Sequence, residues 1–378
     1  MLTHAGRCRD SPGCASLIRV EPTALVLGLS GTGLAVARAL GRRGVRVLGV
    51  DPSRAALGRF SRYVRASTEL TVDALRALAE DARPVLFACG DPEFSWALDH
   101  REALASFTRL PGAIATGAAE AALDKRRLYR RCQELGVLLP TTWLPEDDGD
   151  VATVAREARW PVLVKPACGH DGGPRLRKLT VCASGDALRR AVPDPRAVVL
   201  QELIPGPESA LLVFAAHVGR DGRAGPTVTA RKLRQYPAGT GSGTAVVTER
   251  DDEVAERSLL LIEALGLHGP CGVEWKRAGG RLWHIEVNPR PVLWYALAEA
   301  VVVDAWHELR GEPRPPPVPQ RDGVRWQYLT RDLVAGGRRA WPLGHVLCEA
   351  APDDPLPGLW SPVHAASQWL GARGHSRR

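Results

Sequence analysis

Short apolar runs alternate with amphipathic segments through the first third of the chain. Residues 24–28 (ALVLG) are apolar and lead into a glycine-rich turn, after which LAVARALGRRG has apolar residues at helical spacing. A second apolar run follows at 45–51, and the alternation continues to about residue 115. Alternating strands and helices favour a parallel sheet with helices on both faces. The pattern therefore predicts an α/β domain over residues 23–115.

The pattern changes after a helix predicted at 124–136, which ends at a glycine and is followed by two prolines. Most of the apolar runs from there to residue 288 have the length of strands, and turns rich in Gly and Pro separate them. The last two runs are joined by Gly-Gly, which is typical of a hairpin. Strands are predicted at 162–166 (VLVKP), 177–184, 197–206 (AVVLQELIPG), 210–218, 226–235, 271–278 (CGVEWKRA) and 281–288 (RLWHIEVN), and helices at 185–192 and 253–267.

Composition and charge narrow the class of protein. The 378 residues are 45% hydrophobic and 24% charged, as in an ordinary soluble enzyme, and no apolar run approaches the roughly 20 residues that cross a bilayer. The first twenty residues lack the apolar core of a signal peptide, so we expect a cytoplasmic protein. The net charge of +8 comes without a dense basic run interleaved with aromatics, which argues against nucleic acid. An anionic small molecule suits this charge better.

Cysteine and lysine usage add two constraints. The eight cysteines never form CxxC and have no histidines at zinc-ligand spacing, so reduced thiols are expected. Of the 50 basic residues, 45 are Arg, and the five lysines are Lys125, Lys165, Lys178, Lys232 and Lys276. An ammonium and a guanidinium are not interchangeable, so these lysines are enriched for positions that need a point charge. Chance survival on the surface is the alternative for any one of them.

The turn after the first strand has two interpretations. Gly28, Gly31 and Gly33 open the first helix, and Asp51 ends the second strand, as in a dinucleotide-binding unit. However, the spacing is GxxGxG where the dinucleotide fingerprint has GxGxxG. Close packing of strand and helix is the favoured explanation, and an NAD-dependent oxidoreductase that uses the Gly28 turn stays as an alternative.

Five features in the second half occur in one order. They are Asp124-Lys125, VLVKP with Lys165, a Gly-rich loop, QELIPGPE, and finally VEW with IEVNPR. This order resembles the ATP-grasp superfamily of carboxylate-amine ligases over residues 24–312. The segment RKLRQYP at 231–237 is similar to one in a family of predicted ligases, the ATP-dependent carboligases.

The resemblance implies an α/β ATP-grasp fold, in which an N-terminal Rossmann-like parallel α/β domain precedes two α+β lobes that grip ATP. The implied organisation is a disordered lead at 1–22, the Rossmann-like domain at 23–115, the small lobe at 116–204, the large lobe with the metal site at 205–312, a Pro-rich linker at 313–320 and a C-terminal extension at 321–378. The sequence predicts no fold for the extension, which is rich in Trp, Gly and Pro.

The resemblance also implies an ATP site. Lys125 and Lys165 would contact the phosphates, and the glycine loop would close over them, through Gly172 and Gly173 with Gly169. The backbone at Glu202, Leu203 and Ile204 would read adenine, and Glu208 would hold the ribose. The alternatives for these residues are a solvated Lys125, a strand-edge Lys165, a hairpin tip at the glycines and a simple chain reversal at Pro205-Gly206.

Two glutamates and an asparagine form the predicted metal site. Glu286 and Asn288 lie two residues apart on a strand, so they share one face, and the hairpin would bring Glu274 beside them. Oxygen ligands of this kind suit two Mg²⁺ ions, with Mn²⁺ as a substitute. The carboxylates would repel and raise each other's pKa without a cation. A surface-facing row is the alternative, which Pro289 and Arg290 disfavour by completing the NPR motif.

Three cations are candidates for catalysis: Arg290, Arg231 and Lys232. The chain has Gly272 where D-alanyl ligases carry an arginine, so another cation must meet the transition-state charge. Arg231 and Lys232 are adjacent on a strand and face opposite ways, and we favour Arg231 as the inward residue. If Lys232 is inward instead, Arg234 would join it. Asp91, at the end of a strand, would contact the amine or carboxylate, or serve as a helix cap.

The sequence thus predicts an ATP-dependent carboxylate-amine ligase. A substrate carboxylate would be phosphorylated, and an amine would attack the acyl phosphate to give an amide or peptide-like bond, ADP and phosphate. The expected partners are small-molecule carboxylate and amine substrates, without nucleic acid or membrane, and a homodimer is a candidate assembly. Beside the oxidoreductase, an ATP-dependent carboxylase that phosphorylates bicarbonate and a non-catalytic ATP-binding protein remain as alternatives.

Overall fold

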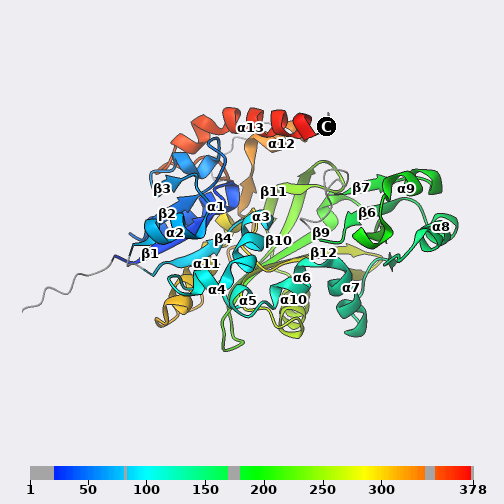
Figure 1. The fold of residues 1–378 in the computed structure, drawn as a ribbon, viewed down its shortest axis with the longest axis horizontal. Coiled ribbons are helices and arrows are strands. Elements are labelled where there is room, and N and C mark those ends of the chain that lie inside the picture. Colours follow the sequence, from blue (N-terminus) through cyan, green and yellow to red (C-terminus); the bar gives the residue numbers. More distant parts are fainter. Residues whose placement is uncertain (1–20, 81–82, 169–178, 337–344, 376–378) are drawn as a thin grey trace, which may run out of the picture.

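The N-terminal part is the α/β domain that the sequence predicted. The computed structural model describes residues 21–80, 83–168, 179–336 and 345–375. Four parallel strands lie in the order β3-β2-β1-β4, with helices on both faces (Figure 1). Residues of β1 therefore alternate between two cores. The elements are β1 (Thr23–Leu27), α1 (Gly31–Gly41), β2 (Arg46–Val50), η1 (Leu57–Phe60), β3 (Val64–Ser67), α2 (Val72–Ala79), β4 (Val85–Ala88), α3 (Asp91–Asp99), α4 (Arg101–Ala105), α5 (Gly112–Ala115) and α6 (Ala119–Leu123).

A second sheet forms the small lobe at the right of Figure 1, with strands in the order β5-β8-β6-β7. The Asp124 side chain caps α7 by accepting the N–H groups of Arg126 and Arg127, which explains why this helix begins at Lys125. Helices α8 and α9 bury their apolar residues in a core shared with this sheet. The elements are α7 (Lys125–Glu134), β5 (Thr142–Trp143), α8 (Asp148–Glu157), β6 (Val162–Pro166), β7 (Thr180–Cys182), α9 (Gly185–Ala191), η2 (Pro195–Ala197) and β8 (Val198–Glu202).

The central sheet has seven strands in the order β13-β12-β9-β10-β11-β14-β15. Strand β9 is buried along its whole length, because its alternate residues pack into the two main cores on opposite faces. The predicted hairpin is present, with Gly279 and Gly280 at positive φ in its turn. The elements are η3 (Glu208–Ala210), β9 (Leu211–Val218), β10 (Ala224–Tyr236), β11 (Ser242–Thr248), α10 (Asp252–Ala264), β12 (Gly269–Ala278), β13 (Arg281–Asn288), η4 (Tyr295–Leu297) and α11 (Glu299–Arg310).

The C-terminal extension completes the central sheet and covers the N-terminal domain. It contains β14 (Arg325–Gln327), α12 (Leu329–Val334), β15 (Val346–Leu347) and α13 (Leu356–His375). Strand β14 pairs with β11, and α13 lies beside η1 at the top of Figure 1. Among the described residues, no helix is long and apolar enough to cross a membrane.

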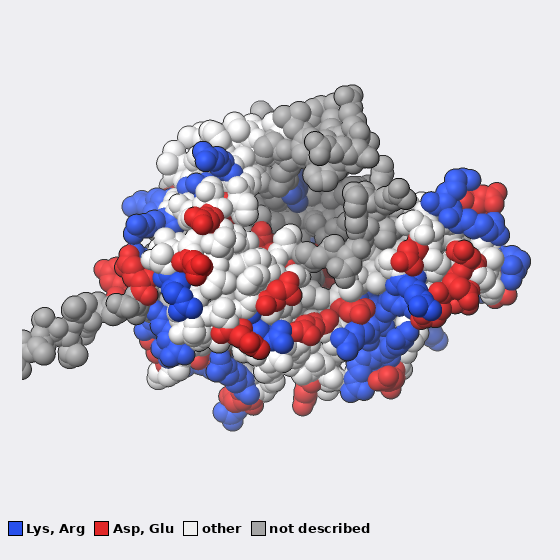
Figure 2. All heavy atoms as spheres, viewed as in Figure 1, with Lys and Arg blue, Asp and Glu red and all other residues white. Residues whose placement is uncertain are grey.

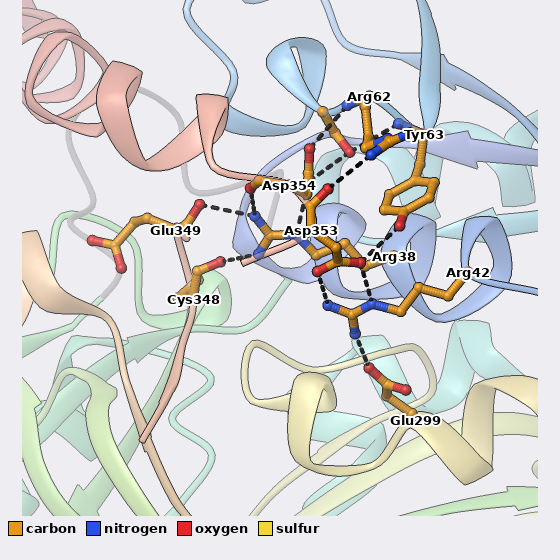
Figure 3. A network of polar contacts seen from close by, with 10 residues as sticks. Arg38, Arg42, Arg62, Tyr63, Glu299, Cys348, Glu349, Asp353 and Asp354 are labelled. Carbon is orange, nitrogen blue, oxygen red and sulfur yellow. Dashed lines mark hydrogen bonds and ion pairs between the residues drawn. The ribbon is translucent and has the colours of Figure 1, made fainter. Parts of the chain in front are cut away.

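Arg38 on α1 holds the extension against the N-terminal domain (Figure 3). Its guanidinium is buried and donates to Asp354 Oδ2 at 2.9 Å and to the carbonyl oxygens of Cys348 and Glu349. Asp354 also accepts hydrogen bonds from the Ser61 hydroxyl and the Arg62 N–H. The neighbouring Asp353 pairs with Arg42 at a half-exposed position. Buried and exposed ion pairs therefore lie side by side in this contact.

This arrangement predicts a large loss of stability for Asp354→Asn and a small one for Asp353→Asn. The first change leaves the buried Arg38 charge uncompensated, which costs about 3–5 kcal/mol, whereas a half-exposed pair contributes about 1 kcal/mol or less. Urea unfolding of both variants measures the difference. Equal losses of unfolding free energy in the two variants would contradict the role assigned to Arg38.

Candidate active site

One cavity of about 920 Å³ lies between the N-terminal domain, the two lobes and the C-terminal extension. All four lysines that the structure describes line it, namely Lys125, Lys165, Lys232 and Lys276. Elsewhere on the surface, basic and acidic side chains are interspersed, as one face shows in Figure 2. The rarity of lysine therefore marks this cavity, since arginine supplies the cations elsewhere.

Lys165 is the most deeply buried of the predicted phosphate-binding groups. Strand β6 carries it, and its ammonium donates to Gln201 Oε1 at 2.6 Å and to the Tyr129 hydroxyl at 3.3 Å. Burial lowers the pKa of Lys165 to about 8, and the Glu286 and Glu274 carboxylates partly oppose this shift. The ammonium is therefore mainly protonated at neutral pH and able to bind an anion.

Lys125 enters the same cavity from the first turn of α7. Its backbone N–H donates to the Ala167 carbonyl at 2.8 Å, which joins the start of the helix to the end of β6. This contact explains how two lysines forty residues apart reach one cavity. The predicted glycine loop, with Gly172 and Gly173, lies outside the described residues.

The predicted metal ligands come together as expected for a hairpin. Glu274 on β12 lies directly opposite Glu286 on β13, and Asn288 is opposite Gly272. All three predicted ligands line the cavity. Two carboxylates paired across strands repel each other unless a cation lies between or beside them. Their oxygens, with the Asn288 amide, form a donor set that fits a hard divalent cation.

Lys232, and not Arg231, faces the cavity, which corrects the expectation from sequence. The Lys232 ammonium is 2.6 Å from Glu274 Oε2, and its side chain is 4% exposed. Arg231 instead pairs with Glu249 at 2.8 Å, and its side chain is 34% exposed. The pairing of β10 with its neighbours turns the lysine inward, so Arg231 has no place among the residues that line the cavity.

Arg234 does not join Lys232, although the two residues were expected to share a face. The ladder between β10 and β11 is irregular between these residues. The Arg234 guanidinium instead donates to both oxygens of Asp332 on α12, at 2.8 and 2.7 Å. Asp332 also accepts from Thr244 and Gln327 and is fully buried. This cluster fixes the C-terminal extension beside the cavity.

Arg290 lines the cavity and pairs with Asp91 at the start of α3. Its Nε donates to Asp91 Oδ1 at 2.7 Å. Arg290, a predicted catalytic cation, and Asp91, a predicted substrate contact, thus form an ion pair with each other. A Cβ at position 272 would lie 2.5 Å from Val292 Cγ1, so the packing of Val292 leaves no space for a larger residue than Gly272. Lys232 and Arg290 therefore supply positive charge on that side of the cavity.

The predicted adenine segment lines the cavity, and Glu208 contacts residues at its edge. The N–H groups of Glu202 and Leu203 donate to the Thr141 and Pro161 carbonyls, which anchors the segment to the small lobe. The Glu202 carboxylate accepts the Arg159 N–H. The Glu208 carboxylate accepts the N–H groups of Gln235 and Gly239 at 3.0 and 2.7 Å, and both of these residues line the cavity.

Protein groups pack closely against Gly28 and Gly33 in the glycine turn of the N-terminal domain. Asp51 Oδ2 accepts the Leu29 N–H at 2.7 Å, and the Glu93 carboxyl carbon lies 3.0 Å from where a Cβ on Gly28 would be. A Cβ on Gly33 would lie 1.9 Å from the Gly28 carbonyl oxygen. The turn therefore serves close packing of β1 against α1, and its residues Ser30, Gly31 and Thr32 line the cavity.

Several residues that line the cavity were not predicted from the sequence. Gln201 and Tyr129 hold the Lys165 ammonium, and Tyr328 and Arg331 reach the cavity from the C-terminal extension. Lys276 also lines it, and its membership in the set of five lysines was a usable signal. For the two residues of the extension no signal existed, because no fold was predicted there.

Comparisons with known proteins identify the family of the central domain and structures with a similar fold. Residues 122–292 match the family model of the ATP-grasp domain. No curated protein sequence matches the chain. N5-carboxyaminoimidazole ribonucleotide synthetase from Thermus thermophilus has a similar structure, with 18% identity and a TM-score of 0.62 over 80% of this chain and 81% of that one. L-amino acid ligase from Bacillus licheniformis is also similar, with 16% identity and a TM-score of 0.55 over 79% and 78%.

Residues 122–292 therefore form an ATP-grasp domain, and the predictions of this superfamily and of the fold are confirmed for this part of the chain.

Proposed function

We propose that the protein is an ATP-dependent carboxylate-amine ligase that forms an amide or peptide-like bond through an acyl phosphate. The observation that carries this proposal is the convergence of four lysines and the Glu274–Glu286 pair on one cavity between the lobes and the N-terminal domain. Such a cavity is large enough for a nucleoside triphosphate beside a second substrate, and its charges suit phosphoryl transfer.

The residues have separate roles in this proposal. The backbone at 202–204 reads adenine, and Lys165 and Lys125 bind the phosphates. Glu274, Glu286 and Asn288 would hold Mg²⁺, which supplies charge neutralisation on the phosphates when bound. Lys232 and Arg290 bind the oxygens of the carboxylate and of the acyl phosphate formed from it. The amine attacks the acyl carbon, phosphate leaves, and no protein nucleophile is needed.

An ATP-dependent carboxylase is the second candidate. The similarity to N5-carboxyaminoimidazole ribonucleotide synthetase supports it, since that fold agreement extends over four fifths of both chains. In this case bicarbonate takes the place of the substrate carboxylate, and the same cations bind it. The oxidoreductase alternative is disfavoured because Asp51, the residue that would hold a ribose in a dinucleotide site, accepts the Leu29 N–H instead.

Thermal unfolding with ADP, ATP and NAD, each with and without Mg²⁺, tests nucleotide binding. A ligand at a hundred times its Kd stabilises the folded state by about 2.7 kcal/mol, and we expect this for ADP with Mg²⁺. Stabilisation by NAD alone would favour the oxidoreductase, and no response to any nucleotide would contradict the proposal.

A further inference from the structure

Lys276 is the one described lysine of the cavity that the proposed reaction does not use. It lies on β12, two residues after Glu274, and its side chain is buried. The ammonium donates to the Ile204 carbonyl oxygen at 2.9 Å and to the Gly206 carbonyl oxygen at 3.1 Å. A buried ammonium persists only with such partners.

The two carbonyls belong to the segment that follows β8 into the large lobe. Its first half is anchored to the small lobe through the Glu202 and Leu203 N–H groups. Its second half turns at Gly206, where φ is +118°, and the Lys276 Cε lies 3.8 Å from the position of a Cβ on that glycine. Lys276 thus fixes the half of the segment that the small lobe leaves unanchored.

The orientation of this backbone segment would decide which purine base the nucleotide site accepts. A backbone segment distinguishes adenine from guanine by which of its N–H and C=O groups point at the base, since the two purines present opposite donors and acceptors. A charged donor that holds two carbonyls fixes that set of groups before the nucleotide arrives. Without the Lys276 ammonium, the peptide groups around Ile204 could rotate and form hydrogen bonds with either adenine or guanine.

We propose that Lys276 is a positioning residue that sets the base selectivity of the nucleotide site, by holding the carbonyls of Ile204 and Gly206. The inference rests on the proposed nucleotide site. It assigns Lys276 no contact with the phosphates, which distinguishes it from Lys125 and Lys165.

Calorimetric titration of Lys276→Met with ADP, GDP and inorganic tripolyphosphate, each with Mg²⁺, tests the inference. We expect the Kd for ADP to rise about tenfold, because two hydrogen bonds from a charged donor are lost. The preference for ADP over GDP narrows, and the Kd for tripolyphosphate stays within about twofold of that of the unmodified protein. In Lys125→Met, the reciprocal control, binding of ADP and of tripolyphosphate weakens together.

Three results separate the hypotheses. Unchanged ADP affinity and selectivity in Lys276→Met would overturn the inference, as would an equal loss of affinity for all three ligands. Failure of the unmodified protein to bind ADP would instead contradict the proposed function. If Lys276→Met does not fold, Lys276→Gln takes its place, because its side-chain amide group can still donate to a carbonyl. We expect its ADP affinity and its preference for ADP over GDP to lie between those of the unmodified protein and those expected for Lys276→Met.

Discussion

Glu286→Gln abolishes ADP formation and leaves the fold intact. The two side chains have nearly the same size and shape, so no cavity forms, and the change removes one negative charge from the pair with Glu274. In the proposed site Glu286 would be one of the residues that hold Mg²⁺, and its loss would weaken charge neutralisation on the phosphates. We expect ADP release to fall by about a hundredfold or more, as when one preorganised group for developing charge is removed.

The measurement is coupled detection of ADP, with circular dichroism and thermal unfolding as controls for the fold. Glu249→Gln is the matched control, because this glutamate is exposed in the connection between β11 and α10 and pairs with Arg231. It should keep its activity. Undiminished turnover of Glu286→Gln would refute the assignment of the metal ligands.

Lys232→Met loses activity, and Arg231→Met retains it. The two residues are adjacent on β10, but Lys232 is buried beside Glu274 whereas Arg231 is exposed beside Glu249. If Lys232 binds the acyl phosphate, its loss lowers kcat and kcat/KM together, by about a hundredfold or more. A change of KM for ATP alone would place Lys232 at the nucleotide instead.

This pair of variants is its own control, because both changes remove a cation and introduce the same side chain. Steady-state kinetics of ADP release measures both. A larger loss in Arg231→Met than in Lys232→Met would contradict the orientation of β10 in the structure and restore the expectation from sequence.

The elements that carry strong local patterns were predictable. The helix at Lys125 has its cap in Asp124, and the hairpin of Glu274 and Glu286 has a Gly-Gly turn between two apolar runs. These local signals place the main candidate residues without knowledge of the tertiary structure. The order of the motifs then relates them to a known fold.

What the sequence leaves open depends on long-range pairing. That Arg231 and Lys232 face opposite ways follows from strand geometry, but the inward residue is set by the pairing of β10 with β9 and β11. The irregular ladder after Lys232 sends Arg234 to Asp332, almost a hundred residues away in sequence. Spacing along one strand contains neither of these facts.

The C-terminal extension shows the same limit. Its strands β14 and β15 have three and two residues, too few for a periodic pattern. They form because the edge of β11 is available for pairing and because Arg38 holds the chain that follows. Tyr328 and Arg331 consequently reach the cavity without any local signal.

Trapping with hydroxylamine tests most directly whether the protein phosphorylates a carboxylate bound in the cavity. The protein is incubated with ATP, Mg²⁺, hydroxylamine and a panel of amino acids, other small carboxylic acids and bicarbonate, and ADP and hydroxamate are measured together. We expect that with the unmodified protein a carboxylic acid yields hydroxamate and ADP in equal amounts. We expect that Glu286→Gln and Lys232→Met yield neither product. ADP release that depends on bicarbonate without hydroxamate would indicate the carboxylase, and ADP release independent of any carboxylate would contradict the account.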